Sequence, residues 1–181
     1  MKKIVPLIMC IAMLLCACAD TGEEQFAKFV SRTAEAENIS FTADVRTEYD
    51  DKTAEFKLRY EQNADGASVE VIEPEMLAGI KAHLKDNDLS LEYDGAMLDI
   101  GTLEAAELSP MSALPLFARA LTGAHTEITW VEGDNIAARL VPADDYLVTV
   151  WISAELAPIS AEISYKEQTV VFIDISDWSI R

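Results

Sequence analysis

The sequence predicts an α+β domain that is mainly β: a strongly curved antiparallel sheet with two or three helices covering its apolar face. Two observations predict it. Strand-length runs alternate apolar and polar residues between turn signals over most of the chain, and two segments instead have apolar residues at helical spacing. No internal repeat, low-complexity tract or linker divides the sequence after its N-terminal segment. One domain is therefore expected over residues 23–181.

The first twenty residues have the pattern of a secretory signal peptide. Lys2 and Lys3 give a positive head, residues 4–15 are apolar apart from Pro6, and small residues follow. The apolar run meets Asp20 before reaching the roughly 18 residues that a permanent transmembrane anchor needs. The sequence therefore predicts a cleaved signal over residues 1–17.

All three cysteines of the chain lie within its first eighteen residues. The stretch LCAC, residues 15–18, resembles the lipobox of bacterial lipoproteins, in which a leucine lies three residues before the modified cysteine. The resemblance implies a thioether-linked diacylglycerol on Cys18, with acyl chains such as palmitate, and a lipidated tether over residues 18–22. Cys16 fits less well because bulky Leu15 precedes it. The mature domain would then be held on the outer face of the cell membrane, with no disulfide to stabilise it.

The charge of the chain excludes several partners. Thirty-two acidic and 14 basic side chains give a formal charge of −18, and loss of Lys2 and Lys3 with the signal brings the mature domain near −20. Such a surface repels nucleic-acid backbones and anionic lipid head groups. No nucleic-acid partner is expected, and membrane attachment is expected through the two acyl chains alone.

The mature sequence begins with a predicted amphipathic helix over residues 23–37. Acidic residues occupy its first turn, and one stripe at helical spacing carries Phe26, Phe29, Val30 and the pair Thr33-Ala34.

After Asn38 the hydrophobic period changes to two, which predicts a long antiparallel hairpin with one dry face. Residues 50–52 form the predicted turn between its strands. The expected inward side chains are Ile39, Phe41, Ala43, Val45, Thr47 and Tyr49 on the first strand, and Ala54, Phe56, Leu58 and Tyr60 on the second.

Shorter alternating runs follow. The third strand contains Val69 and Val71 and ends at Pro74, and residues 74–78 are predicted to form one helical turn. Asp94-Gly95 is the strongest hairpin signal in the chain. Further strands are expected around residues 80–84, 89–93 and 98–100.

A second helix is predicted over residues 108–123. Ser109 supplies a capping hydroxyl, Pro110 suits the first helical position, and Gly123 marks the end. Pro115 is expected to kink this helix or restart it. Five strands are predicted beyond it, at residues 128–130, 136–140, 146–152, 159–165 and 169–175, giving ten or eleven in one antiparallel meander.

This order of elements resembles the LolA/LolB-type lipoprotein-carrier superfamily. The resemblance rests on the N-terminal helix, the paired strands, LSLEYDG, SPMSALPLFARAL and the final VFIDISDW. It implies a half-open β-barrel plugged by helices, and it is closest to the lipid-anchored Gram-positive members, which include the clostridial spore-germination lipoproteins. The arginine-proline and Phe-Arg-Trp strand signature of the periplasmic carriers is missing, because the stretch here reads YEQNADGASVEV. Cys18 is therefore the sole residue to which the resemblance assigns a role.

The sequence carries no recognisable catalytic or metal-binding motif. His83 and His125 are isolated, and no GxSxG, HExxH, P-loop or GxGxxG pattern occurs. The acidic stretches at residues 86–88 and 144–145 lack EF-hand spacing and suit hairpin tips. We therefore expect a non-enzymatic protein with no metal and no cofactor besides the covalent diacylglycerol.

Two later strands, residues 146–152 and 169–173, are apolar on both faces. They indicate either central strands covered on both sides or the lining of a hydrophobic groove. The candidate groove residues are Phe41, Phe56, Leu58, Leu91, Tyr93, Phe117, Trp130 and Trp151, and the candidate lid helix carries Met111, Leu114, Phe117 and Leu121.

Two functional hypotheses follow from these patterns. In the first, the domain binds a lipid, an acyl chain or a lipoprotein in the groove and releases it when the helix at residues 111–121 shifts. In the second, it is a protein–protein scaffold of the cell envelope or a stabilising partner of a secreted hydrolase, with spore germination as one setting. A filled interior with an exposed apolar patch would favour the second.

Overall fold

The computed structural model describes residues 22–49, 52–102 and 108–181. Within these ranges, eleven strands form one antiparallel sheet, accompanied by two α-helices and one 3-10 turn. The helical elements are α2 (Gly22–Ala34), η1 (Glu75–Leu77) and α3 (Pro110–Gly123). The strands are β1 (Ile39–Tyr49), β2 (Lys52–Asn63), β3 (Gly66–Glu73), β4 (Lys81–Lys85), β5 (Asp88–Tyr93), β6 (Ala96–Thr102), β7 (His125–Glu132), β8 (Asn135–Ala143), β9 (Tyr146–Ile152), β10 (Pro158–Tyr165) and β11 (Gln168–Ile180).

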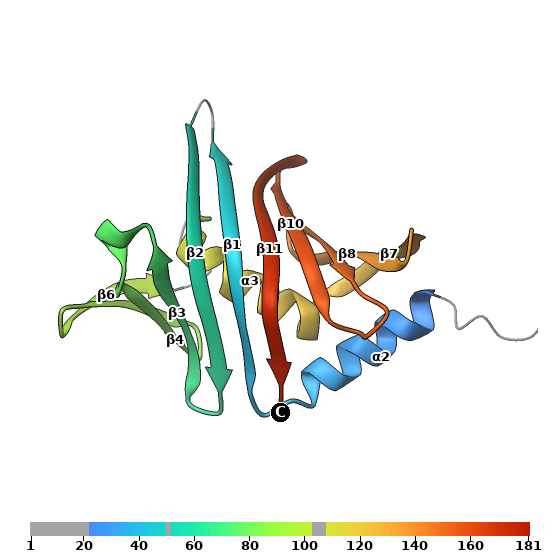
Figure 1. Cartoon of the computed structure of the whole chain (residues 1–181), viewed down its shortest axis with the longest axis horizontal. Coiled ribbons are helices and arrows are strands. Elements are labelled where there is room, and N and C mark those ends of the chain that lie inside the picture. The colour runs from blue at the N-terminus through green and yellow to red at the C-terminus, as the bar shows by residue number, and fades with distance from the viewer. Residues whose placement is uncertain (1–21, 50–51, 103–107) are drawn as a thin grey trace, which may run out of the picture.

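The first and last strands of the chain pair at the centre of the sheet. The order is β6-β5-β4-β3-β2-β1-β11-β10-β9-β8-β7, so two meanders run outward from the central β1–β11 pair (Figure 1). The prediction of one meander is wrong, because α3 lies between β6 and β7 in the chain and these two strands do not pair. The outermost strands, β6 and β7, do not pair with each other, and the sheet stays open between them. The predicted half-open architecture is confirmed.

Helix α3 joins the two outer strands and lies across the concave face of the sheet (Figure 1). It packs on β1, β2 and β3 of one arm and on β8 and β10 of the other, so the sheet wraps around it. The predicted cap at its start is confirmed, since the Ser109 side chain accepts from the Ser112 backbone N–H. The Ser112 hydroxyl accepts in turn from the Ser109 backbone N–H, which completes a capping box that was not predicted. The helix continues through Pro115, so the predicted restart there is wrong.

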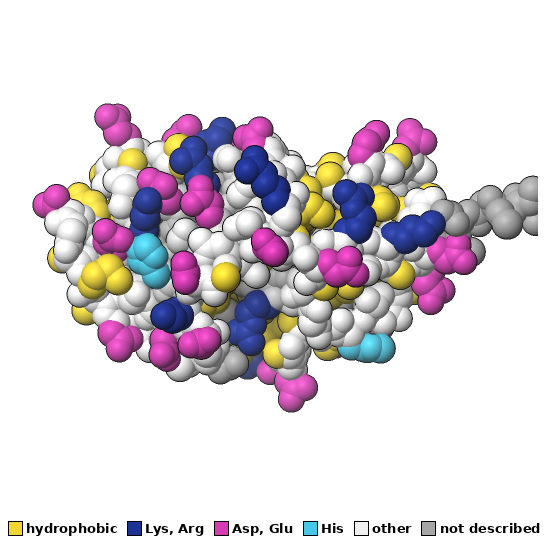
Figure 2. Space-filling view, turned by 90° about the horizontal axis from the view of Figure 1, so that it is seen from below, with side chains coloured by type: hydrophobic (Ala, Val, Ile, Leu, Met, Phe, Trp, Pro, Cys, Tyr) yellow, Lys and Arg dark blue, Asp and Glu magenta, His cyan; other side chains and the backbone are white. Residues whose placement is uncertain are grey.

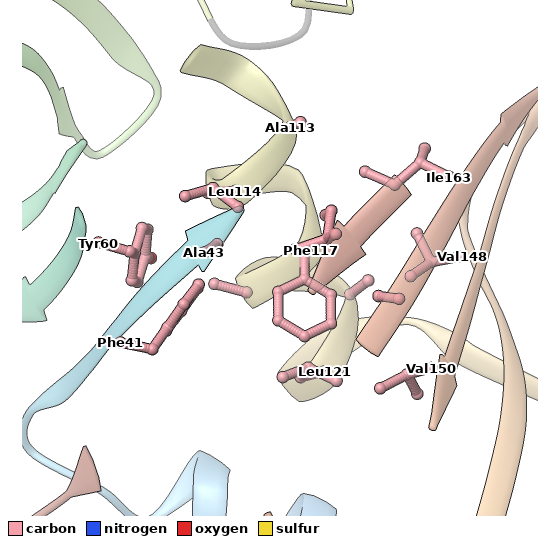
Figure 3. Packing of buried hydrophobic residues seen from close by; sticks show 14 of the residues in the cluster. Phe41, Ala43, Tyr60, Ala113, Leu114, Phe117, Leu121, Val148, Val150 and Ile163 are labelled. Atoms are coloured by element: carbon pink, nitrogen blue, oxygen red, sulfur yellow. The ribbon is translucent and has the colours of Figure 1, made fainter. Parts of the chain in front are cut away.

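The main core lies between α3 and the sheet. Leu114, Phe117 and Leu121 of α3 are almost completely buried and point into it. Figure 3 shows Phe117 between side chains of the N-terminal arm, such as Phe41, and those of the C-terminal arm, such as Val148. Because one helix supplies the packing for both arms, α3 fixes the curvature of the sheet.

Helix α2 extends this core toward the C-terminal arm. Phe26, Phe29 and Thr33 of the predicted stripe are buried, whereas Val30 is half-buried and Ala34, predicted for the same stripe, is exposed at the end of the helix. Phe29 lies 6.2 Å from Trp178 between ring centroids, and α2 also packs on α3, β7 and β8. The helix ends at Ala34, three residues before the predicted end, and β11 extends to Ile180, beyond its predicted end at residue 175.

The signal peptide, the acylation of Cys18 and most of the tether fall on residues 1–21, outside the described residues, and stay predictions. Within the described ranges, no helix has the length and apolarity needed to cross a bilayer.

Candidate hydrophobic binding site

The concave face beneath α3 is filled by side chains. Phe41 and Tyr60 stack with ring centroids 4.9 Å apart, and Phe117 meets Phe41 edge to face at 5.9 Å. The Tyr60 hydroxyl donates to Gln62 Oε1 over 2.7 Å, and burial raises the pKa of this phenol. Tyr60 is therefore neutral, and the covered part of the concave face is a packed core.

The candidate groove residues lie in four environments, three of them on the concave face. Phe41, Leu58 and Phe117 belong to the filled core, and Phe56 and Leu91 are half-buried against it. Tyr93 also lies on the concave side but is 57% exposed.

Trp130 and Trp151 lie on the opposite, convex face. In β9 the inward residues are Val148, Val150 and Ile152, so Trp151 between them points outward. The predicted residues therefore do not line one groove.

The two tryptophans form a small polar cluster with Glu132. Ala137 of β8 pairs with Trp130 of β7 on one side and with Trp151 of β9 on the other. Both indole N–H groups donate to Glu132 Oε2, over 2.9 Å from Trp151 and 3.2 Å from Trp130. These hydrogen bonds, that of Trp151 first, hold the pKa of Glu132 below its ordinary value.

The candidate lid residues all lie on α3. Leu114, Phe117 and Leu121 are buried in the core, whereas Met111 is half-buried. Their burial shows that α3 covers the sheet, and its movement stays a prediction.

An apolar groove that the sequence did not predict lies between α2 and the outer strand β7. It has a volume of about 600 Å³. Phe26, Ala27 and Val30 line it from α2, and Thr126, Ile128 and Thr129 line it from β7, with Glu23, Ser31 and Glu127 completing the lining. The signal that could have indicated it is Val30, an apolar residue of the predicted helical stripe that remains half-buried in the structure.

A second groove, of about 510 Å³, lies along β1, β2 and β11. Its lining is largely charged: Arg46 stacks on the Phe172 ring at 4.2 Å, and Lys57 Nζ lies 3.9 Å from Asp44 Oδ1. This groove is less suited to an apolar ligand than the groove between α2 and β7.

No protein-family model matches the sequence, and no curated protein matches it. Solved structures do match. A LolA superfamily protein from Nitrosomonas europaea superposes with a TM-score of 0.53 at 14% identity, covering 90% of this chain and 94% of that one. The chain has a LolA-like fold.

Two further structures share this LolA-like fold. A DUF1329 family protein from Desulfovibrio piger superposes with a TM-score of 0.53 at 10% identity, covering 88% of this chain and 91% of that one. A putative outer membrane lipoprotein-sorting protein domain from Vibrio parahaemolyticus superposes with a TM-score of 0.50 at 12% identity, covering 89% of this chain and 94% of that one. Identities this low establish the fold and leave the ligand to be argued from this chain's own residues.

The titratable groups of the LolA-like domain are dispersed. Among the described residues, no group of three or more His, Asp or Glu side chains converges as a metal site would require. His83 Nε2 contacts Glu92 Oε2 at 2.7 Å on the outer part of the N-terminal arm, and His125 is the first residue of β7.

Proposed function

We propose that this protein is an extracytoplasmic lipoprotein, anchored by diacylglycerol on Cys18, that binds one apolar chain in the groove between α2 and β7. The ligand class is a lipid acyl chain, free or attached to another lipoprotein. Binding requires no chemical step and no cofactor.

The observation that carries the proposal is the groove of about 600 Å³ with Phe26, Ala27 and Val30 of α2 in its lining. Ligand sites in proteins commonly span about 300–1,000 Å³ and are lined mainly by apolar side chains. A chain that buried about eight methylene groups there would gain about 6 kcal/mol before the costs of association. The filled core beneath α3 leaves this groove as the better-suited site.

The position of the groove also supports a ligand drawn from the membrane. Glu23 lines one end, five residues after the proposed lipid anchor at Cys18. The four residue-to-residue steps from Cys18 to Gly22 span at most about 14 Å, so the proposed anchor would hold this part of the domain near the bilayer. Glu23 and Glu127 at the rim favour a neutral or cationic head group over an anionic one.

The test is lipid retention by the purified mature protein carrying Cys18→Ala, measured by native mass spectrometry after exposure to phosphatidylcholine and diacylglycerol micelles. Ala27→Trp is expected to fill the groove and abolish retention. Ala34→Trp is the matched control, because Ala34 is exposed on the same helix and is not among the groove residues. Absence of retained lipid on the parent protein, or equal retention by both tryptophan variants, would refute the proposal.

A further inference from the structure

The outer strand of the N-terminal arm, β6, is exposed along almost its whole length. Met97 is 60% exposed and Leu98 63%, and the neighbouring Ile100 and Tyr93 are also exposed. β6 ends the sheet order, so its outer edge pairs with no other described strand. Figure 2 shows hydrophobic side chains beside acidic ones at the left end of the molecule, where Figure 1 places β6.

The two faces of this arm differ in chemistry. Leu98 pairs with Leu91, which continues the apolar concave row. On the convex face, Asp99 pairs with Ser90, and Glu92 pairs with Met97. A strand added at this edge would therefore meet Leu98 on the concave face, and Met97 and the Asp99 carboxylate on the convex face.

The backbone of β6 also suits strand addition. Asp94 and Gly95 have φ of 50° and 76°, the positive values of a type I′ turn. Such a two-residue turn makes Tyr93 and Ala96 a hydrogen-bonded pair, and the antiparallel ladder then alternates along the strands. The N–H and C=O of Met97 accordingly point toward the free edge, where an incoming strand can pair with them.

Charge selects the kind of partner. Residues 86–102 contain five Asp or Glu and no Lys or Arg. A second copy of this chain would bring the same acidic segment against the edge, which like-charge repulsion disfavours. A strand with basic side chains on one face and apolar ones on the other complements both faces of β6.

We propose that β6 is a docking strand for another protein, which adds an extended segment of alternating apolar and basic residues to this edge. The apolar side chains of the segment pack on Leu98 and Tyr93, and a Lys or Arg side chain of the segment pairs with Asp99 while its methylene groups lie along Met97. This interaction goes beyond the proposed acyl-chain binding, because β6 lies at the opposite end of the sheet from β7.

The experiment measures peptide binding to the acylated mature protein in phosphatidylcholine nanodiscs by fluorescence anisotropy. The probe is a labelled octapeptide of alternating Lys and Val, compared with a peptide of four Lys followed by four Val. The alternating peptide is expected to bind about tenfold more tightly, because only it places all its valines on one face of a strand. Equal affinity for the two peptides would overturn the proposal.

Two substitutions at Met97 distinguish backbone hydrogen bonding from electrostatic attraction between side chains. Met97→Pro removes the outward N–H and is expected to weaken binding about tenfold, whereas Met97→Ala keeps the N–H and is expected to change it less than about threefold. Unchanged thermal unfolding shows that the proline variant folds.

Asp99→Lys provides a second readout that does not depend on the proline variant. It is expected to weaken binding of the Lys-Val peptide and to strengthen binding of an alternating Glu-Val peptide. If Met97→Pro binds like Met97→Ala and Asp99→Lys leaves both peptides unaffected, β6 is not a docking strand. Acyl-chain retention is unaffected by these variants, so the two proposals fail separately.

Discussion

Phe41 and Leu98 lie on the same cross-strand row of the concave face, but one is buried and the other is exposed to solvent. The row runs from Phe41 through Tyr60, Val69, Ala82 and Leu91 to Leu98. Phe41 is 2% exposed, whereas Leu98 is 63% exposed. Both belong to strands of one continuous sheet and both face inward.

The difference between these two regions comes from α3. The helix packs on β1, β2 and β3, and there Phe41, Leu58 and Val69 are buried. Ala54, predicted to face inward at the start of β2, is exposed. At β6 the same alternation leaves apolar side chains in contact with solvent. Strand pattern therefore sets which face a residue occupies, and the reach of the covering helix sets whether that face becomes core or binding surface.

The largest change in the free energy of unfolding is expected from truncating Phe117, the central buried side chain of α3. Phe117 is fully buried between the two arms, so Phe117→Ala should lower the free energy of unfolding by about 3–5 kcal/mol. Phe172→Ala is the matched control, because Phe172 lies half-buried on the convex face beneath Arg46 and should cost about 1–2 kcal/mol. Urea unfolding followed by tryptophan fluorescence measures both. Equal losses would show that α3 does not organise the core.

An intermediate effect is expected from one truncation made in both regions. Leu58→Ala, in the covered region, should cost about 2–5 kcal/mol, whereas Leu98→Ala, on the exposed strand, should cost less than about 0.5 kcal/mol. The same unfolding measurement checks the pair. A large loss for Leu98→Ala would mean that β6 is packed against part of the protein in solution, and it would remove this edge as a docking surface.

The smallest effect concerns pH and the convex cluster. Hydrogen bonds from Trp151 and Trp130 lower the pKa of Glu132, so ionised Glu132 stabilises the folded state above its ordinary pKa. That contribution is lost as the pH falls through the lowered pKa. The stability difference between the parent and Glu132→Gln should therefore shrink as the pH falls from about 7 to about 3. A difference independent of pH in denaturant titrations would contradict this account.

The sequence predicts the strands well because period-two alternation is a local signal. The hairpin of β1 and β2 shows this: Phe41, Ala43 and Val45 face inward as predicted. The phase is ambiguous where both faces are apolar. In β9, Leu147 and Trp151 alternate with Val148, Val150 and Ile152, and hydrophobicity alone does not tell which set faces the core.

The sites that the sequence missed depend on distant segments. The groove between α2 and β7 joins elements about a hundred residues apart, and no local pattern specifies that pairing. Tyr93 lies on the predicted face of the sheet but is exposed, because α3 packs mainly on β1, β2 and β3 of this arm. The alternation of a strand does not encode how far the covering helix extends. Pro115 indicated a break, but α3 continues through it with the side chain buried.

The pairing of the first strand with the last has a consequence for biogenesis. β1 gains its second neighbour only when β11, from Gln168 onward, is available, so a chain truncated before that point leaves the middle of the sheet unpaired. Contacts this distant in sequence form late in folding. If the chain is exported as proposed, it would remain loosely folded until almost all of it had crossed the membrane, because the central pair of the sheet cannot form earlier.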